Sequence, residues 1–389
     1  MEPESILEAP QCLREQGLGL HTIRLQTRNL REAFITVPAV GKEEPTWVLK
    51  RLYDYLETQP DFRIVRQDVF GVASTASHRR QLRAYRLGSA EWPLTWVQEG
   101  NGEGAPLAGI QVHAVADVAV TPLWLDERVV GTVFDTPTAR FCALGGLRPA
   151  LASAPRRDQA RETFDLMEEA LALAGMTFKH VCRTWFYLED ILDWYEAFNQ
   201  VRNEFFAARG VFNGVVPAST GVGGSNAAGT AVVADLIAVR PKDPRVTLRA
   251  IPSPLQCPAP EYGSSFSRAV ELSLPDHRRL YVSGTASIAP DGKTVHGEDP
   301  EGQVRLTMEV VEAILRSREM DWSNVTRAIG YFKHAEDAPV FERWLTAQKL
   351  APLPAIIAKN DICRDDLLFE IEVDAIRTGP GEGRPDCPG

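Results

Sequence analysis

Acidic and apolar side chains alternate along the segment 367–376. Successive side chains of a strand point to opposite faces, so Glu370, Glu372 and Asp374 would share one face. This pattern is typical of an antiparallel strand with a solvated acidic face. A glutamate buried against apolar residues instead keeps its proton to higher pH, which is what a general acid requires. The segment thus has two interpretations, a structural strand and a catalytic one.

An internal duplication favours the catalytic interpretation for Glu370. Residues matching 159–187 recur at 303–331, an offset of 144, and Pro217-Ala218 recurs as Pro354-Ala355, an offset of 137. At the second offset Glu372 aligns with Asp235, whereas Glu370 aligns with Val233. An acid carried by one copy alone predicts a single working site. The acid shared by both copies is expected to have a structural role.

The elements that position these residues follow from hydrophobic periodicity and flanking glycines. Each copy is predicted to contain, in order, a strand, a helix, a strand, a helix and a closing strand: 140–144, 158–174, 181–188, 193–209 and 230–239 in one, and 279–283, 301–318, 325–332, 337–349 and 367–376 in the other. One unit is roughly ββ-α-β-α-ββ. This predicts an α+β fold in which helices cover mixed sheets.

The N-terminal third carries either a fainter third copy or a chance likeness. It contains an amphipathic helix at 47–56, a strand at 62–72, Trp92-Pro-Leu-Thr95 in the place of Val216-Pro-Ala-Ser219, and a closing strand at 109–114. The predicted domains are 1–127 (divergent), 128–252 (first clear unit) and 253–377 (second clear unit, with the proposed site). Residues 378–389 are rich in Gly and Pro and are expected to form a disordered tail.

Composition limits the classes of function. The 389 residues are 44% hydrophobic with a net charge of −10, which is typical of a globular protein. There is no dense basic stripe for nucleic acid and no run of eighteen apolar residues for a membrane span. Six scattered cysteines show no zinc spacing, and no secretory signal pattern is present. We therefore expect a cytoplasmic protein with no metal and no membrane or nucleic-acid partner.

Each unit resembles the RidA superfamily, formerly YjgF. The likeness rests on the helix that opens with Gln-x-Arg, the Pro-Ala turn and the closing strand 369–376. Single-unit members form trimers with pockets between subunits, so the resemblance implies a pseudo-trimeric arrangement within one chain, and a monomer. Imine-hydrolysing members place an arginine after the Pro-Ala turn. Here that position holds Ser219, Ile356 and, in the N-terminal third, Thr95, which disfavours a standard imine deaminase.

Over about 150–376 the chain is most similar to the chorismatase group of that superfamily. The similarity rests on Arg183-Thr-Trp-Phe-Tyr-Leu188, Tyr195-x-x-Phe-Asn199-x-x-Arg202, Glu261-Tyr-Gly263, Ser283-Gly-Thr-Ala-Ser-Ile288, and Cys363 followed seven residues later by Glu370. It implies cofactor-independent hydrolysis of chorismate, or of a similar enolpyruvyl cyclohexadiene carboxylate, to pyruvate and a hydroxylated ring acid. Two departures leave a related substrate open: Ala-Pro-Asp-Gly-Lys follows Ile288, and the 219–230 loop has an unusual composition.

The resemblance also implies roles for individual residues. Glu370 would protonate the enolpyruvyl methylene, Cys363 would bias the product, and Gly284 and Ala286 would shape the opposite wall. The residues expected to hold the substrate are Arg183, Tyr195, Arg202, Tyr262 and Arg268. Arg327 repeats Arg183 in the other copy, so a shared structural role is the alternative for Arg183. Two other functions remain open, an imine or enamine deaminase of the RidA type and a non-catalytic metabolite-binding protein.

Overall fold

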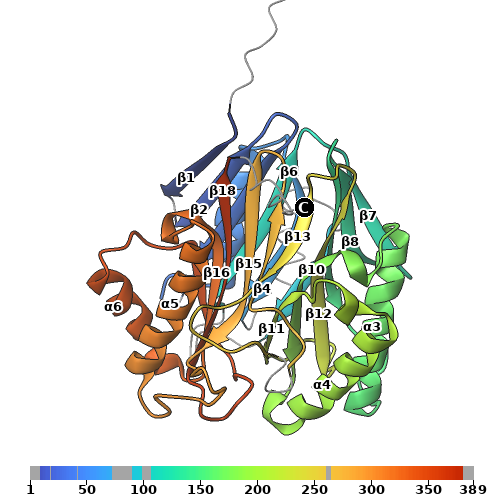
Figure 1. The fold of residues 1–389 in the computed structure, drawn as a ribbon. Helices are drawn as coiled ribbons and strands as arrows, with labels where there is room; N and C mark the ends of the chain where they lie inside the picture. Colours follow the sequence, from blue (N-terminus) through green and yellow to red (C-terminus); the bar gives the residue numbers. More distant parts are fainter. Residues whose placement is uncertain are drawn as a thin grey trace, which may run out of the picture.

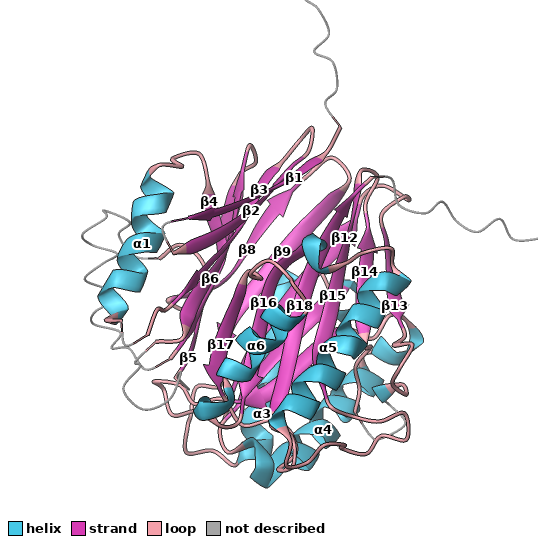
Figure 2. Ribbon diagram, turned by 90° about the vertical axis from the view of Figure 1, so that its left-hand side faces the viewer, coloured by secondary structure: helices cyan, strands magenta, loops and turns pink. Residues whose placement is uncertain are grey.

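The structure, a computed structural model, describes residues 9–17, 19–41, 43–71, 90–98, 107–259 and 264–379. Its strands form three six-stranded sheets around a common centre, with the long helices on the outside (Figures 1 and 2). Each sheet comes from one stretch of chain, which defines unit 1 (residues 11–116), unit 2 (120–241) and unit 3 (247–378). The α+β class and the pseudo-trimeric arrangement are thereby confirmed.

The three units repeat one order of elements. Unit 1 contains β1 (Gln11–Gly17), β2 (Leu20–Gln26), β3 (Arg31–Pro38), α1 (Pro45–Glu57), β4 (Arg63–Phe70), β5 (Leu94–Val97) and β6 (Gly109–Ala116). Unit 2 contains β7 (Val120–Leu125), β8 (Arg128–Asp135), β9 (Ala139–Leu147), α3 (Arg156–Leu173), β10 (Val181–Leu188), α4 (Ile191–Ala208), β11 (Ala218–Gly223) and β12 (Val232–Pro241). Unit 3 contains β13 (Thr247–Ile251), β14 (Ala269–Ser273), β15 (His277–Ala286), α5 (Pro300–Ser317), β16 (Val325–Phe332), α6 (Pro339–Ala347), β17 (Ala355–Lys359) and β18 (Phe369–Thr378).

Sheet topology shows that the N-terminal third is a true third copy. The strand order is β1-β2-β3-β6-β4-β5 in unit 1 and β13-β14-β15-β18-β16-β17 in unit 3, with the same pattern in unit 2. In each sheet the last two strands of this order run parallel and all other pairs are antiparallel. The helices α4 and α6 supply the crossovers that parallel pairing requires. In unit 1 the segment between β4 and β5 includes residues 72–89, which lie outside the described ones.

The unit divisions fall earlier than the sequence placed them. The expected division at 127/128 lies between β7 and β8, which pair as a hairpin in unit 2. The expected division at 252/253 follows β13, which pairs with β14 in unit 3. We therefore place the divisions at 117–119 and 242–246. The edge strands β7 and β13 are half-exposed, so they lack the apolar runs that reveal the inner strands. β18 extends to Thr378, and the described residues end at 379.

Each unit has its own helix–sheet core, and the three sheets share a further core at the centre. On α5, Val304, Met308, Val311 and Leu315 recur at helical spacing and are fully buried against the sheet of unit 3. The inner faces of the sheets meet in an apolar cluster that draws on all three units: Phe70, Val97, Ala108, Trp185, Tyr187, Val222, Ile329, Tyr331, Ile356 and Ala358.

Three buried arginines tie the units together in a ring. They lie on β4, β10 and β16, each directly after a bulge in its strand, and each reaches an acid or amide on the closing strand of the next unit. Arg66 contacts Asp235 at 3.1 Å, Arg183 contacts Glu372 at 2.9 Å, and Arg327 contacts Gln111 at 2.9 Å. All three guanidinium groups surround the indole ring of Trp185, at 3.8, 4.4 and 5.2 Å from its centroid. Buried charges of one sign are tolerated here because each has an oppositely charged or polar partner.

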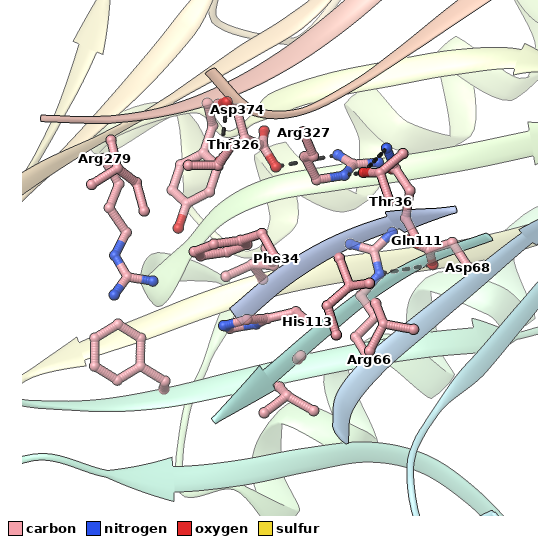
Figure 3. Close-up of a pocket in the computed structure, with 18 of the residues that line it drawn as sticks. Phe34, Thr36, Arg66, Asp68, Gln111, His113, Arg279, Thr326, Arg327 and Asp374 are labelled. Atoms are coloured by element: carbon pink, nitrogen blue, oxygen red, sulfur yellow. Dashed lines mark hydrogen bonds and ion pairs between the residues drawn. The ribbon is translucent and has the colours of Figure 1, made fainter. Parts of the chain in front are cut away.

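The same junction encloses a small cavity of about 60 Å³ (Figure 3). Arg66, Asp68 and Gln111 of unit 1 line it together with Arg327 and Asp374 of unit 3, and the polar groups point toward one another. A cavity of this size holds a few water molecules rather than a metabolite. The centre of the molecule is therefore a structural junction, and the candidate site must lie elsewhere.

Candidate active site

A larger cavity of about 940 Å³, here called the Glu370 cleft, opens between unit 2 and unit 3. Unit 2 supplies α4 residues between 192 and 203 and the start of β11, and unit 3 supplies the segment before β14, the end of β15, β18 and the turn before β18. Seven of the nine residues expected at the site line this cleft: Tyr195, Arg202, Arg268, Gly284, Ala286, Cys363 and Glu370. Tyr262 lies outside the described residues; Ser264, two positions further on, is part of the lining.

Glu370 lies on β18 between the neighbouring strands β15 and β16. The side chain is 5% exposed, and its carboxyl group lies directly over Gly284, where a Cβ atom would collide with Oε1. No described residue forms a hydrogen bond or ion pair with this carboxyl group. Burial and the nearby negative charge of Glu372 raise the pKa of Glu370 to about 8, against the smaller opposing effects of Arg183 and Arg268. Near neutral pH Glu370 therefore holds a transferable proton.

Glu372, two residues further along the same face, has the opposite electrostatics. It accepts hydrogen bonds from Trp185 at 2.8 Å, Arg183 at 2.9 Å and Arg327 at 2.7 Å. These partners hold the pKa of Glu372 below its ordinary value despite complete burial. Two glutamates on one strand thus have pKa values shifted in opposite directions.

Arg183 does not line the cleft, which corrects its assignment to substrate binding. Its side chain is fully buried and donates to Thr220 Oγ1 at 2.6 Å as well as to Glu372. Its counterparts Arg66 and Arg327 occupy the same place in the other units. The arginine therefore belongs to the ring between the sheets, because its position on β10 directs the side chain to the common centre.

Four arginines line the cleft, Arg157, Arg202, Arg268 and Arg364, and two of them, Arg202 and Arg268, are buried. Arg268 is 4% exposed, donates to the carbonyl of Cys257 at 2.9–3.0 Å and lies 5.7 Å from the centroid of the Phe266 ring. Arg202, from α4, is 1% exposed and donates to Asn199 Oδ1 at 2.6 Å. Each guanidinium is thus held in place by these contacts. A planar guanidinium held in this way suits a carboxylate ligand.

Tyr195 and Cys363 complete the parts of the wall that were expected. The Tyr195 ring stacks on Phe198 with centroids 6.3 Å apart and lies beside Gly221. Burial, reinforced by the charge of Glu370, raises the pKa of the Cys363 thiol to about 12. Cys363 is therefore a neutral thiol near the acid and not a thiolate nucleophile.

The structure adds residues that sequence reasoning missed. Thr220 joins the two units, because its hydroxyl oxygen accepts from the Gly284 N–H at 3.0 Å and from Arg183. Asn203 on α4 accepts from Ser265 Oγ at 2.5 Å. Asn203 follows Arg202 directly, but nothing in its spacing distinguished it from a solvated helix residue. Thr220 follows Ser219 of the Pro-Ala turn, and that adjacency was the available signal.

Comparison with known proteins defines the family. A model of the endoribonuclease L-PSP family, the RidA family, matches residues 146–237 and 258–377, and the chain belongs to this family. The chain is 31% identical over 224 residues to a chorismatase of Streptomyces rapamycinicus, an alignment that covers 51% of this chain and 65% of that protein. A chorismatase of Streptomyces hygroscopicus is 24% identical over 313 residues, covering 72% of this chain and 89% of the relative.

A solved chorismatase structure has the same fold. It superposes with a TM-score of 0.59 and 19% identity, covering 80% of this chain and 92% of the other. Three RidA-like units in one chain are therefore shown by the fold and by the family match together. Within the described part of the chain, no helix has the length and hydropathy needed to cross a bilayer.

Proposed function

We propose that the protein is a cofactor-independent hydrolase of chorismate or of a similar enolpyruvyl cyclohexadiene carboxylate. The observation that carries the proposal is Glu370, a buried carboxylic acid without a described hydrogen-bond partner, in a cleft whose lining also includes the buried arginines Arg202 and Arg268. The two chorismatase relatives support the choice of substrate class. Hydrolysis of an enol ether needs an acid and a water molecule, and the cleft provides the acid.

In the proposed reaction Glu370 transfers its proton to the terminal methylene carbon of the enolpyruvyl group. The double-bond electrons form the new C–H bond, and an oxocarbenium ion results. Water adds to this ion and loses a proton, and the resulting hemiketal collapses to pyruvate and the ring alcohol. A pKa of about 8 leaves about nine-tenths of Glu370 protonated at pH 7.

The other residues of the Glu370 cleft have binding and shaping roles in this proposal. Arg268 and Arg202 hold the substrate carboxylates, and Tyr195 offers a neutral hydrogen-bond donor. Gly284 leaves the space above its backbone free for the Glu370 carboxyl group. Cys363 and Ala286 border the ring, where a neutral thiol can influence whether the product is a dihydroxycyclohexadiene acid or 3-hydroxybenzoate. Tyr262 remains proposed for substrate binding on the family resemblance alone.

We also propose that the protein acts as a monomer in the cytoplasm. One chain supplies both walls of the Glu370 cleft, so no second chain is needed to complete it. The five described cysteines are free, as is usual in a reducing compartment. A stable trimer of chains in light scattering would contradict the monomer.

Pyruvate release from chorismate tests the proposed function. The parent protein is expected to release pyruvate, and Glu370→Gln is expected to lower the rate by about 10²–10⁴-fold because the amide has no transferable proton. Arg305→Gln, an exposed change on α5, is the control and should retain the parental rate. Absence of pyruvate above background with the parent would refute the proposal. Trapping of 2-aminoacrylate hydrolysis with semicarbazide would then distinguish an imine deaminase from a binding protein.

A further inference from the structure

A second cleft lies between unit 1 and unit 2, at the place that the Glu370 cleft occupies between units 2 and 3. We call it the Arg148 cleft. Its volume is about 250 Å³, and its lining includes Trp92 and Leu94 of unit 1 and Arg128, Val130 and Arg148 of unit 2. None of these residues takes part in the proposed reaction.

The two clefts have the same backbone frame. Leu144 pairs with Leu236 across β9 and β12, as Val282 pairs with Val373 across β15 and β18. A glycine N–H at the end of the strand donates to a threonine of the preceding unit in both: Gly146 to Thr95 at 2.8 Å, and Gly284 to Thr220 at 3.0 Å. The two clefts therefore share a hydrogen bond between units as well as their location in the fold.

The chemistry of the two clefts differs. In unit 2, Val233 occupies the position that Glu370 occupies in unit 3, so the counterpart of the acid is an apolar residue. In addition, Arg148 and Arg128 both line the Arg148 cleft. The cleft thus has positive charge and apolar surface, but no counterpart of the catalytic acid.

Neither arginine has a partner in the described part of the chain. Arg128 and Arg148 are both partly buried, and neither forms a hydrogen bond or ion pair there. This distinguishes them from the buried arginines of the ring, each of which is paired. Partial burial, together with the positive charge of Arg128, lowers the pKa of Arg148. Two adjacent cations in a partly dry cleft repel each other, and a bound anion would relieve that repulsion.

We propose that the Arg148 cleft is a non-catalytic binding site for a small carboxylate with an aromatic or alicyclic body. The guanidinium groups of Arg128 and Arg148 hold the carboxylate, since Arg presents paired N–H donors in the geometry that a carboxylate accepts. Trp92, Leu94 and Val130 contact the apolar body. Inorganic phosphate has the charge but no apolar body to fill that part of the cleft.

Calorimetric titration with benzoate tests the site in the full-length protein. The parent is expected to bind benzoate, and the double variant Arg128→Gln/Arg148→Gln is expected to lose a binding component, its affinity falling by at least about 10-fold. Because the Glu370 cleft also contains arginines, Arg268→Gln is titrated in parallel and should retain that component. Arg305→Gln is the surface control, and benzamide, which has the same body without the charge, should not bind.

The outcomes separate this site from the proposed hydrolase. Pyruvate release in the absence of benzoate should be the same in the double variant and the parent, because neither arginine touches the Glu370 cleft. Unfolding temperatures measured beside the titrations exclude a folding defect. Unchanged benzoate binding in a folded double variant would overturn the proposal. So would binding of inorganic phosphate at this cleft without binding of benzoate.

Discussion

The Glu370 cleft and the Arg148 cleft are two versions of one interface between units. Each has a buried acid on the closing strand of its second unit, Glu372 on β18 in one and Asp235 on β12 in the other. Each acid is paired with an arginine of the preceding unit. The Glu370 cleft also has an acid, Glu370, in its wall, whereas the corresponding residue of unit 2 is Val233. The difference teaches that these two junctions keep a buried acid paired with an arginine, whereas the residue at the position of Glu370 differs between them; at the third junction the amide Gln111 takes the place of the acid.

The paired acids Glu372 and Asp235 differ in how well they are neutralised. Glu372 contacts two arginines and the Trp185 indole, and its pKa is lowered. Asp235 has one arginine partner, Arg66, and burial together with the charge of Asp68 raises its pKa to about 6. The junction of units 2 and 3 is thus the more strongly charged of the two.

The largest expected effect follows from that difference. Glu372→Gln leaves Arg183 and part of Arg327 without a counter-charge in a buried place, and we expect a loss of about 3–5 kcal/mol in the free energy of unfolding. Asp235→Asn is the matched change at the other junction and should cost less, because burial already disfavours its ionised form. Denaturant unfolding at pH 7 measures both. Equal losses would show that the two junctions are electrostatically alike.

A glycine in each cleft gives the next comparison. Gly284→Ala would place a methyl group in the space of Glu370 Oε1, so the acid must move, and we expect turnover of chorismate to fall about 100-fold. At Gly145, in the Arg148 cleft, an added Cβ would lie 3.0 Å from Thr95 Oγ1 and 3.3 Å from Pro93 Cβ. Gly145→Ala is therefore expected to fold with small adjustments and to keep the parental rate. If Gly284→Ala also keeps that rate, the position of Glu370 over Gly284 is not required for turnover.

These residues also show how far the sequence alone could lead. The duplication aligned Glu370 with Val233 and Glu372 with Asp235, and the structure gives the two glutamates opposite pKa shifts. Helical and strand periodicity located the expected helices and strands within a few residues, because those elements bury one face or both. The inner strands β3, β8 and β14 were not identified, although they are largely buried. The edge strands β7 and β13 escaped notice because their side chains are half-exposed and carry no such period.

Contacts between units could not be predicted in the same way. Arg183 appeared in a motif of the family, and only the relative placement of three sheets shows that it points to the common centre. The pairing of Thr220 with Gly284 joins residues 64 apart in sequence that belong to different units. Such contacts depend on the docking of whole sheets, and local sequence patterns carry no information about docking.

The smallest expected effect is a difference between Glu370 and Glu372 in how the free energy of unfolding depends on pH. The folded-state pKa of Glu370 is raised to about 8, whereas an unfolded glutamate has a pKa of about 4.3. Between these values the folded protein keeps a proton that the unfolded chain has released, so this group lowers the free energy of unfolding as pH rises. In Glu370→Gln that contribution is absent. We therefore expect the stability of the variant relative to the parent to improve by about 2 kcal/mol from pH 5.5 to pH 7.

Glu372→Gln is the control for this measurement because the pKa of Glu372 is lowered and not raised. Its own stabilising contribution is complete above the unfolded pKa and is lost only in more acidic solution. Because its charge also raises the pKa of Glu370, its cost should change between pH 5.5 and pH 7, but by less than that of Glu370→Gln. Denaturant unfolding of the parent and both variants at the two pH values gives the comparison. A pH-independent difference for Glu370→Gln would mean that Glu370 is ionised in the folded protein, and it could then not serve as the acid of the proposed reaction.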